Sequence, residues 1–389
     1  MLIISLDAVG DDEFERLAEY PAFGAFSRQA AVFRGVPSLF VSNTYPIHAS
    51  IVTGLNPDGH GLISNTEQFP ERYPVWHSRE SCIRAKTLWQ AAMERGIETA
   101  AVFWPVTAFS KTIRYNIPEV LSRPGENQII TSMRAGSKLL QLRMLLRHHR
   151  LLSGINQPAR DNFGAACMAD ILRKYKPGLA LMHLTAYDSI CHKHGKGSGA
   201  LNAALRSLDD NLAILLDAVG GDSDVLIFTD HSQINVHTYI EPNDILVEAG
   251  LLHRENDEYI RGGSGCYIEC CGGSAFFHAG GLPPDRIREL RGIIGQSEGF
   301  SRVLTDAEKQ CSGYTDTAFG FCAQPGYAYM AFGPGHRAEH GYPVDMPDYK
   351  AFYMARGFGL APGGVNQGGS LLDIAPLAAN RLGVELGIK

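Results

Sequence analysis

Three aspartates in this chain each stand at or just beyond the end of an apolar run, where they could hold a metal ion. They are Asp7 after Leu2–Leu6, Asp188 after Leu179–Leu184, and Asp230 after Val225–Thr229. His231 follows Asp230 directly, and His192 lies four residues after Asp188, which is one turn of a helix. Carboxylate and imidazole ligands together suit Zn²⁺ or Mn²⁺ and not copper or iron–sulfur clusters. These residues predict a metal-dependent enzyme.

The apolar runs also predict how these residues come together. Buried strands of a parallel sheet read as continuous apolar runs, and ligands bind outside their carboxyl ends. We expect an amphipathic helical stretch over 11–30, a turn-rich segment over 31–43, and a helix over 46–53 that ends at Gly54. Near the end of the chain, residues 351–355 predict another strand. The fold class is therefore α/β, with a largely parallel central sheet.

The composition is that of an ordinary globular protein. Apolar residues make up 45% of the 389 residues and charged residues 20%. Because single cores stop growing at roughly 250–300 residues, the length allows one sheet domain with inserted elements. The net charge of −6 argues against a nucleic-acid polymer as partner. The eight cysteines have no recurring zinc-type spacing, so we expect them to be reduced and mostly structural.

The N-terminus and the hydropathy predict where the protein works. The first strand starts at Leu2 and leaves no basic segment, apolar core or cleavage site of a signal peptide, so we expect a cytoplasmic protein. No apolar stretch approaches the roughly 18 residues that span a bilayer, and we expect no membrane partner. Residues 133–150 are rich in leucine, arginine and lysine, and we interpret their basic face as a solvated surface. The sequence leaves the oligomeric state open.

Thr44 is a candidate nucleophile at the start of the helix expected over 46–53. Pro46 suits the first turn of a helix, and a hydroxyl just before it can cap the free N–H groups. Thr44 could therefore be only an N-cap. A helix N-terminus also favours anions, such as a phosphoryl oxygen or an alkoxide, and a neighbouring metal ion would help the hydroxyl to ionise. The residues alone leave both interpretations open.

Five parts of the chain match one known family in its own order. They are Asp7, residues 44–61 (TYPIHASIVTGLNPDGHG), residues 188–195 (DSICHKHG), Asp230 with His231, and residues 339–342 (EHGY). Together they resemble the nucleotide pyrophosphatase/phosphodiesterase family of the alkaline phosphatase superfamily. The resemblance implies an alkaline-phosphatase-like three-layer sandwich with an inserted cap. We expect one catalytic domain over 1–389, with about residues 120–175 and 235–335 as insertions or cap elements.

The resemblance also implies a site with two divalent metal ions, of which Zn²⁺ is the expected one. By matching position, Asp7, Asp230 and His231 would hold one ion with the Thr44 oxygen as a further ligand. Asp188, His192 and His340 would hold the other. The implied reaction is hydrolysis of a phosphodiester or phosphoanhydride bond in a small phosphorylated substrate such as a nucleotide. Thr44 would attack phosphorus and form a covalent phospho-threonine intermediate.

Other residues are assigned by the same resemblance. Asn65 lies where the family binds a phosphoryl oxygen, although by itself it would read as a turn residue, and Trp104 lies near the expected pocket and could pack in the core or contact substrate. His48 and His60 would support the loop around the nucleophile. His194 would point elsewhere. His336 competes with His340 for the metal role, and the surrounding motif favours His340.

Two other activities of the superfamily stay open at this point. Phosphomonoesterases as the superfamily is known use serine and an arginine on the phosphate, whereas the nucleophile position here is Thr44 and no arginine falls at a motif position. A phosphonoacetate hydrolase would share the threonine and both metal sites, but it would need extra cationic groups in its pocket. A non-enzymatic binding protein is disfavoured, because the nucleophile and every metal ligand are present.

Overall fold

The computed structural model describes residues 1–256, 258–330 and 335–387. Its largest element is an eight-stranded sheet with the strand order β18-β2-β17-β6-β1-β5-β3-β4. The strands are β1 Leu2–Leu6, β2 Ala31–Pro37, β3 Thr99–Val102, β4 Tyr115–Ile117, β5 Leu179–Leu184, β6 Val225–Thr229, β17 Lys350–Arg356 and β18 Val365–Gln367. All three apolar runs that precede the aspartates are strands in the middle of this sheet.

The centre of the sheet is parallel. β1 pairs in parallel with β5 on one side and with β6 on the other, and β3 pairs in parallel with both β5 and β4. β17 is antiparallel to both of its neighbours, β6 and β2. The expectation of a largely parallel sheet is confirmed, and the strand expected over 351–355 is the antiparallel β17.

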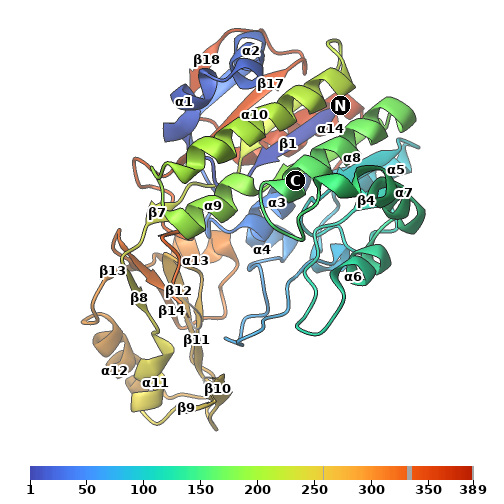
Figure 1. The fold of residues 1–389 in the computed structure, drawn as a ribbon. Coiled ribbons are helices and arrows are strands. Elements are labelled where there is room, and N and C mark those ends of the chain that lie inside the picture. The colour runs from blue at the N-terminus through green and yellow to red at the C-terminus, as the bar shows by residue number, and fades with distance from the viewer. Residues whose placement is uncertain (257, 331–334, 388–389) are drawn as a thin grey trace.

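Helices cover both faces of the sheet, as Figure 1 shows. One face packs on α1 Phe14–Ala18, α2 Pro21–Gln29, α7 Lys138–His148, α8 Ala159–Tyr175, α9 Ala186–His194 and α10 Ala200–Val219. The other packs on α3 Thr44–Thr53, α5 Leu88–Glu94 and α14 Ile374–Leu382. Along β1, Leu2, Ile4 and Leu6 enter the first core and Ile3 the second, because successive side chains of a strand face opposite ways. The three-layer arrangement is confirmed.

Two local expectations are wrong. The stretch over 11–30 is not one helix, because α1 ends at Ala18 and Pro21 begins α2. The segment over 31–43 contains β2 and not only turns. Gly35 interrupts the apolar pattern of β2, and it lies in the left-handed region with φ +62°. This break made the strand look like a turn in the sequence.

Residues between β6 and β17 build a smaller lobe with its own hydrophobic core. Its main sheet is antiparallel, in the order β11-β12-β14-β13, and comprises β11 Tyr267–Cys270, β12 Ser274–His278, β13 Phe300–Val303 and β14 Phe319–Ala323. The lobe also contains α11 Asn243–Glu248, α12 Pro284–Ile294, α13 Asp306–Ser312, β8 Thr238–Ile240, β9 Leu252–Glu255, β10 Glu258–Arg261 and β15 Tyr327–Tyr329. The interpretation of residues 235–335 as a cap stays a prediction.

The other expected insertion, residues 120–175, contains two kinds of structure. α6 Gln128–Ala135 contacts α7, and α7 contacts β4 at the edge of the sheet, whereas α8 packs against β3 and β5. The short elements α4 Pro57–His60, β7 Ile234–Asn235 and β16 Ala338–Glu339 complete the chain. None of the helices in the described residues has the length and apolarity to cross a membrane.

Candidate active site

Strand register brings Asp7 and Asp230 together. Leu6 of β1 lies opposite Thr229 of β6 and also opposite Leu184 of β5. Asp7 and Asp230 are the next residues of their strands, so their side chains leave the sheet at the same edge. Both are buried. The sheet therefore places two carboxylates side by side in a region from which water is largely excluded.

The first group of possible metal ligands consists of Asp7, Asp230 and His231. One ligand atom from each lies within 4.8 Å of the others. Asp230 accepts hydrogen bonds on Oδ1 from the backbone N–H groups of Ala8 at 3.0 Å and His231 at 2.9 Å. Within the described part of the chain, Asp230 Oδ2 and Asp7 Oδ1 have no hydrogen-bond partner although both are buried. His231 Nε2 lies 3.4 Å from the first and 3.5 Å from the second. A cation between these atoms would satisfy both oxygens.

The second group consists of Asp188, His192 and His340, whose ligand atoms also lie within 4.8 Å of one another. Asp188 and His192 are one turn apart on α9, with His192 Nε2 3.2 Å from Asp188 Oδ1. His340 follows β16, which pairs with β7 just after His231. The structure thus brings together the three residues that the motifs assign to one metal ion.

Each of the three histidines has its Nδ1 facing an oxygen. His192 Nδ1 donates to the Ala338 carbonyl at 2.8 Å, and His231 Nδ1 lies 3.2 Å from the Ser232 carbonyl. His340 Nδ1 lies 3.0 Å from Asn43 Oδ1. Because these oxygens accept hydrogen bonds, the neutral form of each imidazole carries its proton on Nδ1 and its lone pair on Nε2. This is the usual arrangement of metal-binding histidines, and the donor set fits divalent zinc.

Gly341 allows the backbone that carries His340 to approach the small lobe. Its φ is +84°, and a Cβ built on it would lie 1.6 Å from the Cys271 carbonyl oxygen. The Gly341 N–H donates to Ser42 Oγ and to the Tyr349 hydroxyl, each at 3.1 Å. A side chain at position 341 would push the loop away from these partners. The glycine in the Glu-His-Gly-Tyr motif therefore has a direct structural reason.

Thr44 lies where the two groups meet. The His231 and His340 rings are 4.4 Å apart, and Thr44 Oγ1 is 3.4 Å from His231 Nε2. Thr44 is the first residue of α3, and the N-cap position belongs to Asn43. Neither the Asn43 side chain nor the Thr44 hydroxyl caps the first turn of the helix with a hydrogen bond. The interpretation of Thr44 as only an N-cap is therefore wrong. Its hydroxyl instead faces the first donor group.

Asn65 caps the helix from a distant loop. Its Oδ1 accepts the Tyr45 N–H at 2.9 Å. Because a backbone N–H can only donate, the oxygen of the amide must face the helix and Nδ2 must face away from it. Nδ2 has no hydrogen-bond partner within the described ranges. It is free to donate to a phosphoryl oxygen, the role predicted from the motif.

The charges of the site depend on one another. Burial and the charges of Asp230 and Asp188 raise the pKa of Asp7 well above its usual value. Burial lowers the pKa of His192, but Asp188 and Glu339 raise it more, to about 10. Burial and the neighbouring His231 lower the pKa of His340 to about 3, so this imidazole is neutral near pH 7. A bound cation would favour the charged carboxylates and displace the proton of His192.

The remaining histidines fall into supporting and outside positions. His48 is buried and contacts the Thr44 carbonyl at 2.7 Å and Ser5 Oγ at 2.9 Å. His60 is buried and holds Ser50 Oγ at 2.9 Å. His194 is exposed and joins no donor group in the described residues. His336, whose side chain is 46% exposed, joins His192 and Glu339 in a neighbouring group.

Trp104 does not reach the site surface, and the prediction that it contacts substrate is wrong for this structure. It is 0% exposed, with its ring 4.9 Å from that of His48 and 6.0 Å from that of Phe228. Trp76 lines a cavity of about 300 Å³ together with Asn65 and His340. The small lobe also contributes to the lining of this cavity, including Glu269 and Tyr329.

Sequence reasoning missed three polar residues that lie beside the ligand groups. His183 on β5 lies 3.2 Å from Asp7 Oδ2 through Nε2, and its Nδ1 lies 3.8 Å from Glu119. Gln233 donates a hydrogen bond to Asp188 Oδ1. The available signal was a histidine inside the apolar run of β5 and a glutamine three residues after Asp230. Glu119 lies in a loop after β4 and carries no comparable signal.

Comparison with known proteins identifies what this arrangement is similar to. The model of the type I phosphodiesterase / nucleotide pyrophosphatase family matches residues 1–294. A bis(5'-adenosyl)-triphosphatase of Xenopus laevis is 25% identical over 109 residues, which are 27% of this chain and 24% of that protein. Ectonucleotide pyrophosphatase/phosphodiesterase family member 3 of Mus musculus is 24% identical over 199 residues, 47% of this chain and 18% of that protein. The match thus spans about a quarter or less of these relatives.

Solved structures match over nearly the whole chain. Murine ectonucleotide pyrophosphatase/phosphodiesterase 5 has a TM-score of 0.72 at 14% identity, covering 99% of this chain and 95% of its own. The human protein has a TM-score of 0.72 at 16% identity, covering 100% and 96%. An inactive variant of the murine protein in complex with AMP has a TM-score of 0.71 at 14% identity, covering 99% and 95%. These likenesses confirm the alkaline-phosphatase-like fold.

Proposed function

Because the chain belongs to the type I phosphodiesterase / nucleotide pyrophosphatase family, we propose that it hydrolyses phosphodiester or phosphoanhydride bonds through a covalent intermediate on Thr44. The observation that carries the proposal is the meeting of two three-residue donor groups beside the Thr44 hydroxyl, with two buried carboxylate oxygens that lack a partner in the described residues. Asp7, Asp230 and His231 would hold one divalent ion, and Asp188, His192 and His340 the other. Zn²⁺ fits this donor set.

The chain's own residues would carry out the substitution at phosphorus. Divalent ions bound in this way polarise phosphoryl oxygens and lower the pKa of a coordinated hydroxyl. Thr44 gives up its proton to water and its oxygen bonds to phosphorus, while the bond to the leaving oxygen breaks with its electron pair and that oxygen takes up a proton from water. Water then attacks the same phosphorus and releases Thr44. Asn65 Nδ2 donates a hydrogen bond to a non-bridging phosphoryl oxygen and so stabilises the negative charge on that oxygen during the reaction.

The cavity beside Asn65 supports a diester over a dianionic monoester. Its charged lining residues are four carboxylates and one guanidinium: Glu67, Glu71, Glu269, Glu339 and Arg72. A substrate with an extra negative charge would meet repulsion there, and the donor assigned to the phosphoryl oxygen, Asn65, is neutral. Trp76 and Phe69 offer apolar surface to the esterified group. A nucleotide-type ester fits these walls, and AMP is bound by the structural relative described above. A cytoplasmic location and a small-molecule partner remain part of the proposal.

Relative activity on paired substrates tests the proposal. We expect kcat/KM of the zinc-loaded protein to be at least about tenfold higher for the p-nitrophenyl ester of thymidine 5'-monophosphate than for p-nitrophenyl phosphate. The reason is that a charged hydrogen bond, worth roughly 1.5–3 kcal/mol, is missing for the dianion. A tenfold preference for the monoester would show a phosphatase. Rapid release of phosphate from phosphonoacetate would show a C–P hydrolase instead.

A further inference from the structure

Exposed large apolar side chains are concentrated in one part of the chain. In the described ranges sixteen such side chains are exposed, and eight of them fall within residues 121–155, less than a tenth of the chain. They are Leu121, Ile129, Ile130, Leu139, Leu142, Leu146, Leu151 and Ile155. We call these eight residues the α6–α7 face. Patches of this kind mark sites of interaction, whereas isolated exposed apolar residues do not.

The sequence of α7 places its exposed leucines in one stripe. Leu139, Leu142 and Leu146 are spaced three and four residues apart, so they lie on the same side of the helix. They are 85%, 43% and 71% exposed. Leu140 and Met144, on the opposite side, are buried in the core of the sheet domain. Helix α7 therefore has two apolar faces, and the structure covers only one of them.

The charge around the stripe is entirely positive within residues 128–150. This stretch contains five arginine or lysine residues and no aspartate or glutamate, in a chain whose net charge is −6. The five are Arg134, Lys138, Arg143, Arg147 and Arg150. Asp170 approaches from α8 and pairs with Arg147 at 3.0 Å, and Arg143 donates to the Tyr175 hydroxyl at 3.1 Å. An apolar stripe flanked by cations is typical of helices that lie in the surface of an anionic membrane.

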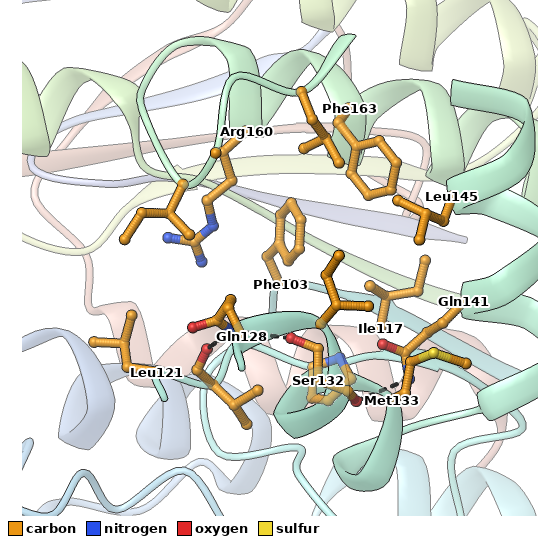
Figure 2. Close-up of a pocket in the computed structure, with 16 residues that line it drawn as sticks. Phe103, Ile117, Leu121, Gln128, Ser132, Met133, Gln141, Leu145, Arg160 and Phe163 are labelled. Atoms are coloured by element: carbon orange, nitrogen blue, oxygen red, sulfur yellow. Dashed lines mark hydrogen bonds between the residues drawn. The ribbon is translucent and has the colours of Figure 1, made fainter. Parts of the chain in front are cut away.

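A cavity of about 370 Å³ opens beside this face, within the size range of ligand pockets. Leu121, Ile129 and Ile155 belong both to the face and to the lining of the cavity. Figure 2 shows the apolar side chains of Phe103, Ile117, Met133, Leu145 and Phe163 around the space. The polar lining residues hydrogen-bond to one another: Gln128 donates to Ser132 Oγ, and Gln141 donates to the Ser132 carbonyl.

One charged group marks an end of this cavity. The Arg160 guanidinium lies 4.8 Å from the centre of the Phe103 ring and donates to Glu119 at 2.6 Å. In Figure 2 its head points into the space between Phe103 and Leu121. The inner surface thus suits a molecule that is mostly hydrocarbon.

We infer that the α6–α7 face binds an anionic lipid surface and that the cavity takes up the hydrocarbon chain of a lipid from it. A nucleic acid would explain the cations but not the exposed leucines, and an apolar protein partner would not need the cations. The expectation of no membrane partner rested on the lack of a spanning segment. Binding at the surface requires none, because apolar side chains insert only into the outer layer of the bilayer.

Vesicle co-sedimentation with the full chain tests the surface. We expect binding to vesicles of equal parts phosphatidylcholine and phosphatidylglycerol, weak binding to phosphatidylcholine alone, and a loss of binding as salt rises. Replacing Leu139, Leu142 and Leu146 by asparagine should lower the bound fraction at least about fivefold. The matched control replaces Met93, Ile214 and Ile293, which are 47%, 40% and 45% exposed elsewhere, and should bind as the wild type does.

Two results would overturn the surface assignment. Equal binding by the leucine variant and the control variant would mean that the α6–α7 face is not the contact. The other is a wild-type dimer in light scattering that the leucine variant dissociates, without vesicle binding by either. That would make the face an interface between two copies of the chain.

Fluorescence of cis-parinaric acid tests the cavity. We expect a saturable increase with the wild-type protein, and an increase at least about fivefold smaller when Ser132→Phe fills the space or Leu121→Asp places a charge at its mouth. Leu121 is 43% exposed, so the second variant should fold even if the first does not. Unfolding curves identify a variant that has lost its structure. Equal fluorescence with wild type and folded Leu121→Asp would show that the chain is not bound in this cavity.

Discussion

The histidines that face the two donor groups are oriented by their neighbours before any ion binds. Ala338 and Ser232 supply backbone carbonyls, and Asn43 supplies a side-chain oxygen, to the three Nδ1 atoms. Because the tautomer and the ring orientation are already fixed, these side chains lose less conformational freedom when a metal ion binds. His183 lies on the other side of Asp7, with its Nε2 3.2 Å from Asp7 Oδ2. Metal affinity in this protein should therefore depend on residues that do not themselves contact the ion.

The choice between His340 and His336 gives a sharp prediction. We expect His340→Ala to lose close to one of two zinc equivalents, because it removes one of three ligands from the group with Asp188 and His192. His336→Ala should keep both, because His336 is bound to Glu339 at 2.6 Å and stands outside that group. Metal analysis of the purified variants decides. If His336→Ala lost the ion and His340→Ala kept it, the ligand would be the other histidine.

The three aspartates and the two histidines near them in sequence could be assigned because they follow strands or share a helix turn, where position in the chain fixes position in space, whereas His340 and Asn65 were assigned only by the family resemblance. Asp7 and Asp230 lie at the ends of paired strands, and His192 is one turn after Asp188. Glu119 and Trp76 could not be assigned, because their places depend on loops packed against distant parts of the chain. For Trp104 the sequence left core packing and substrate contact open, because a side chain at a strand end near a site can point into the core as easily as toward the ligand.

Local elements, more than single side chains, set the distance between the two donor groups. The parallel ladder of β1 and β6 positions the first group, and the two-residue ladder of β7 and β16 positions His340 of the second. The short ladder is a weak support by itself. Close packing of the residues around Gly341 against Ser42, Tyr349 and Cys271 supplements it.

Gly341→Ala should therefore disturb both stability and metal binding. We expect a loss of more than about 1 kcal/mol in the free energy of unfolding, because the new Cβ would overlap the Cys271 carbonyl at a positive φ. Gly220→Ala is the matched control, since it has φ +83° and no atom within 4 Å of the added Cβ. Urea denaturation with and without zinc measures both. Equal losses for the two variants would show that backbone conformation alone, and not the Cys271 contact, matters at position 341.

Elements with an uninterrupted apolar pattern were predictable from the sequence, and interrupted ones were not. The apolar runs of β1, β5 and β6 predicted these strands directly. The end of the helix before Gly54 was also predictable, because glycine is the usual residue at a left-handed C-cap and Gly54 adopts φ +72° there. Gly35 hid β2, and Pro21 divided the expected long helix into α1 and α2. The order of the strands could not be derived, since nothing local in β17 tells that it runs antiparallel between β2 and β6.

Residues from both lobes of the molecule line the candidate substrate cavity. Asn65 and Trp76 come from the sheet domain, whereas Glu269 and Tyr329 come from the lobe between β6 and β17. The family resemblance implied that residues 235–335 form insertions or cap elements. The antiparallel sheet of this lobe and its place beside His340 could not be predicted, because they depend on contacts such as that of Gly341 with Cys271.

Removal of metal should make stability depend on pH. In the metal-free protein the pKa of His192 is raised to about 10, so its protonated form stabilises the fold fully below its usual pKa of about 6.5. That contribution is lost as pH rises from about 6.5 toward 10. Asp7 also lowers stability as pH rises, because its raised pKa means that ionising this buried carboxyl group destabilises the fold. We expect the Tm of chelator-treated protein to fall across this range, and zinc to restore it most at the high end. A Tm that rises with pH without metal would contradict this electrostatic account.

The most direct test of the central claim is to trap the intermediate on Thr44. The zinc-loaded protein is mixed with a nucleoside p-nitrophenyl phosphodiester, quenched in acid during turnover, and digested for peptide mass spectrometry. We predict a nucleotidyl group on Thr44, and for Thr44→Ala no adduct and a kcat lower by roughly three orders of magnitude or more with both metal ions retained. A Thr44→Ala variant that hydrolyses the substrate at the wild-type rate, without an adduct in the wild type, would show that water attacks phosphorus directly.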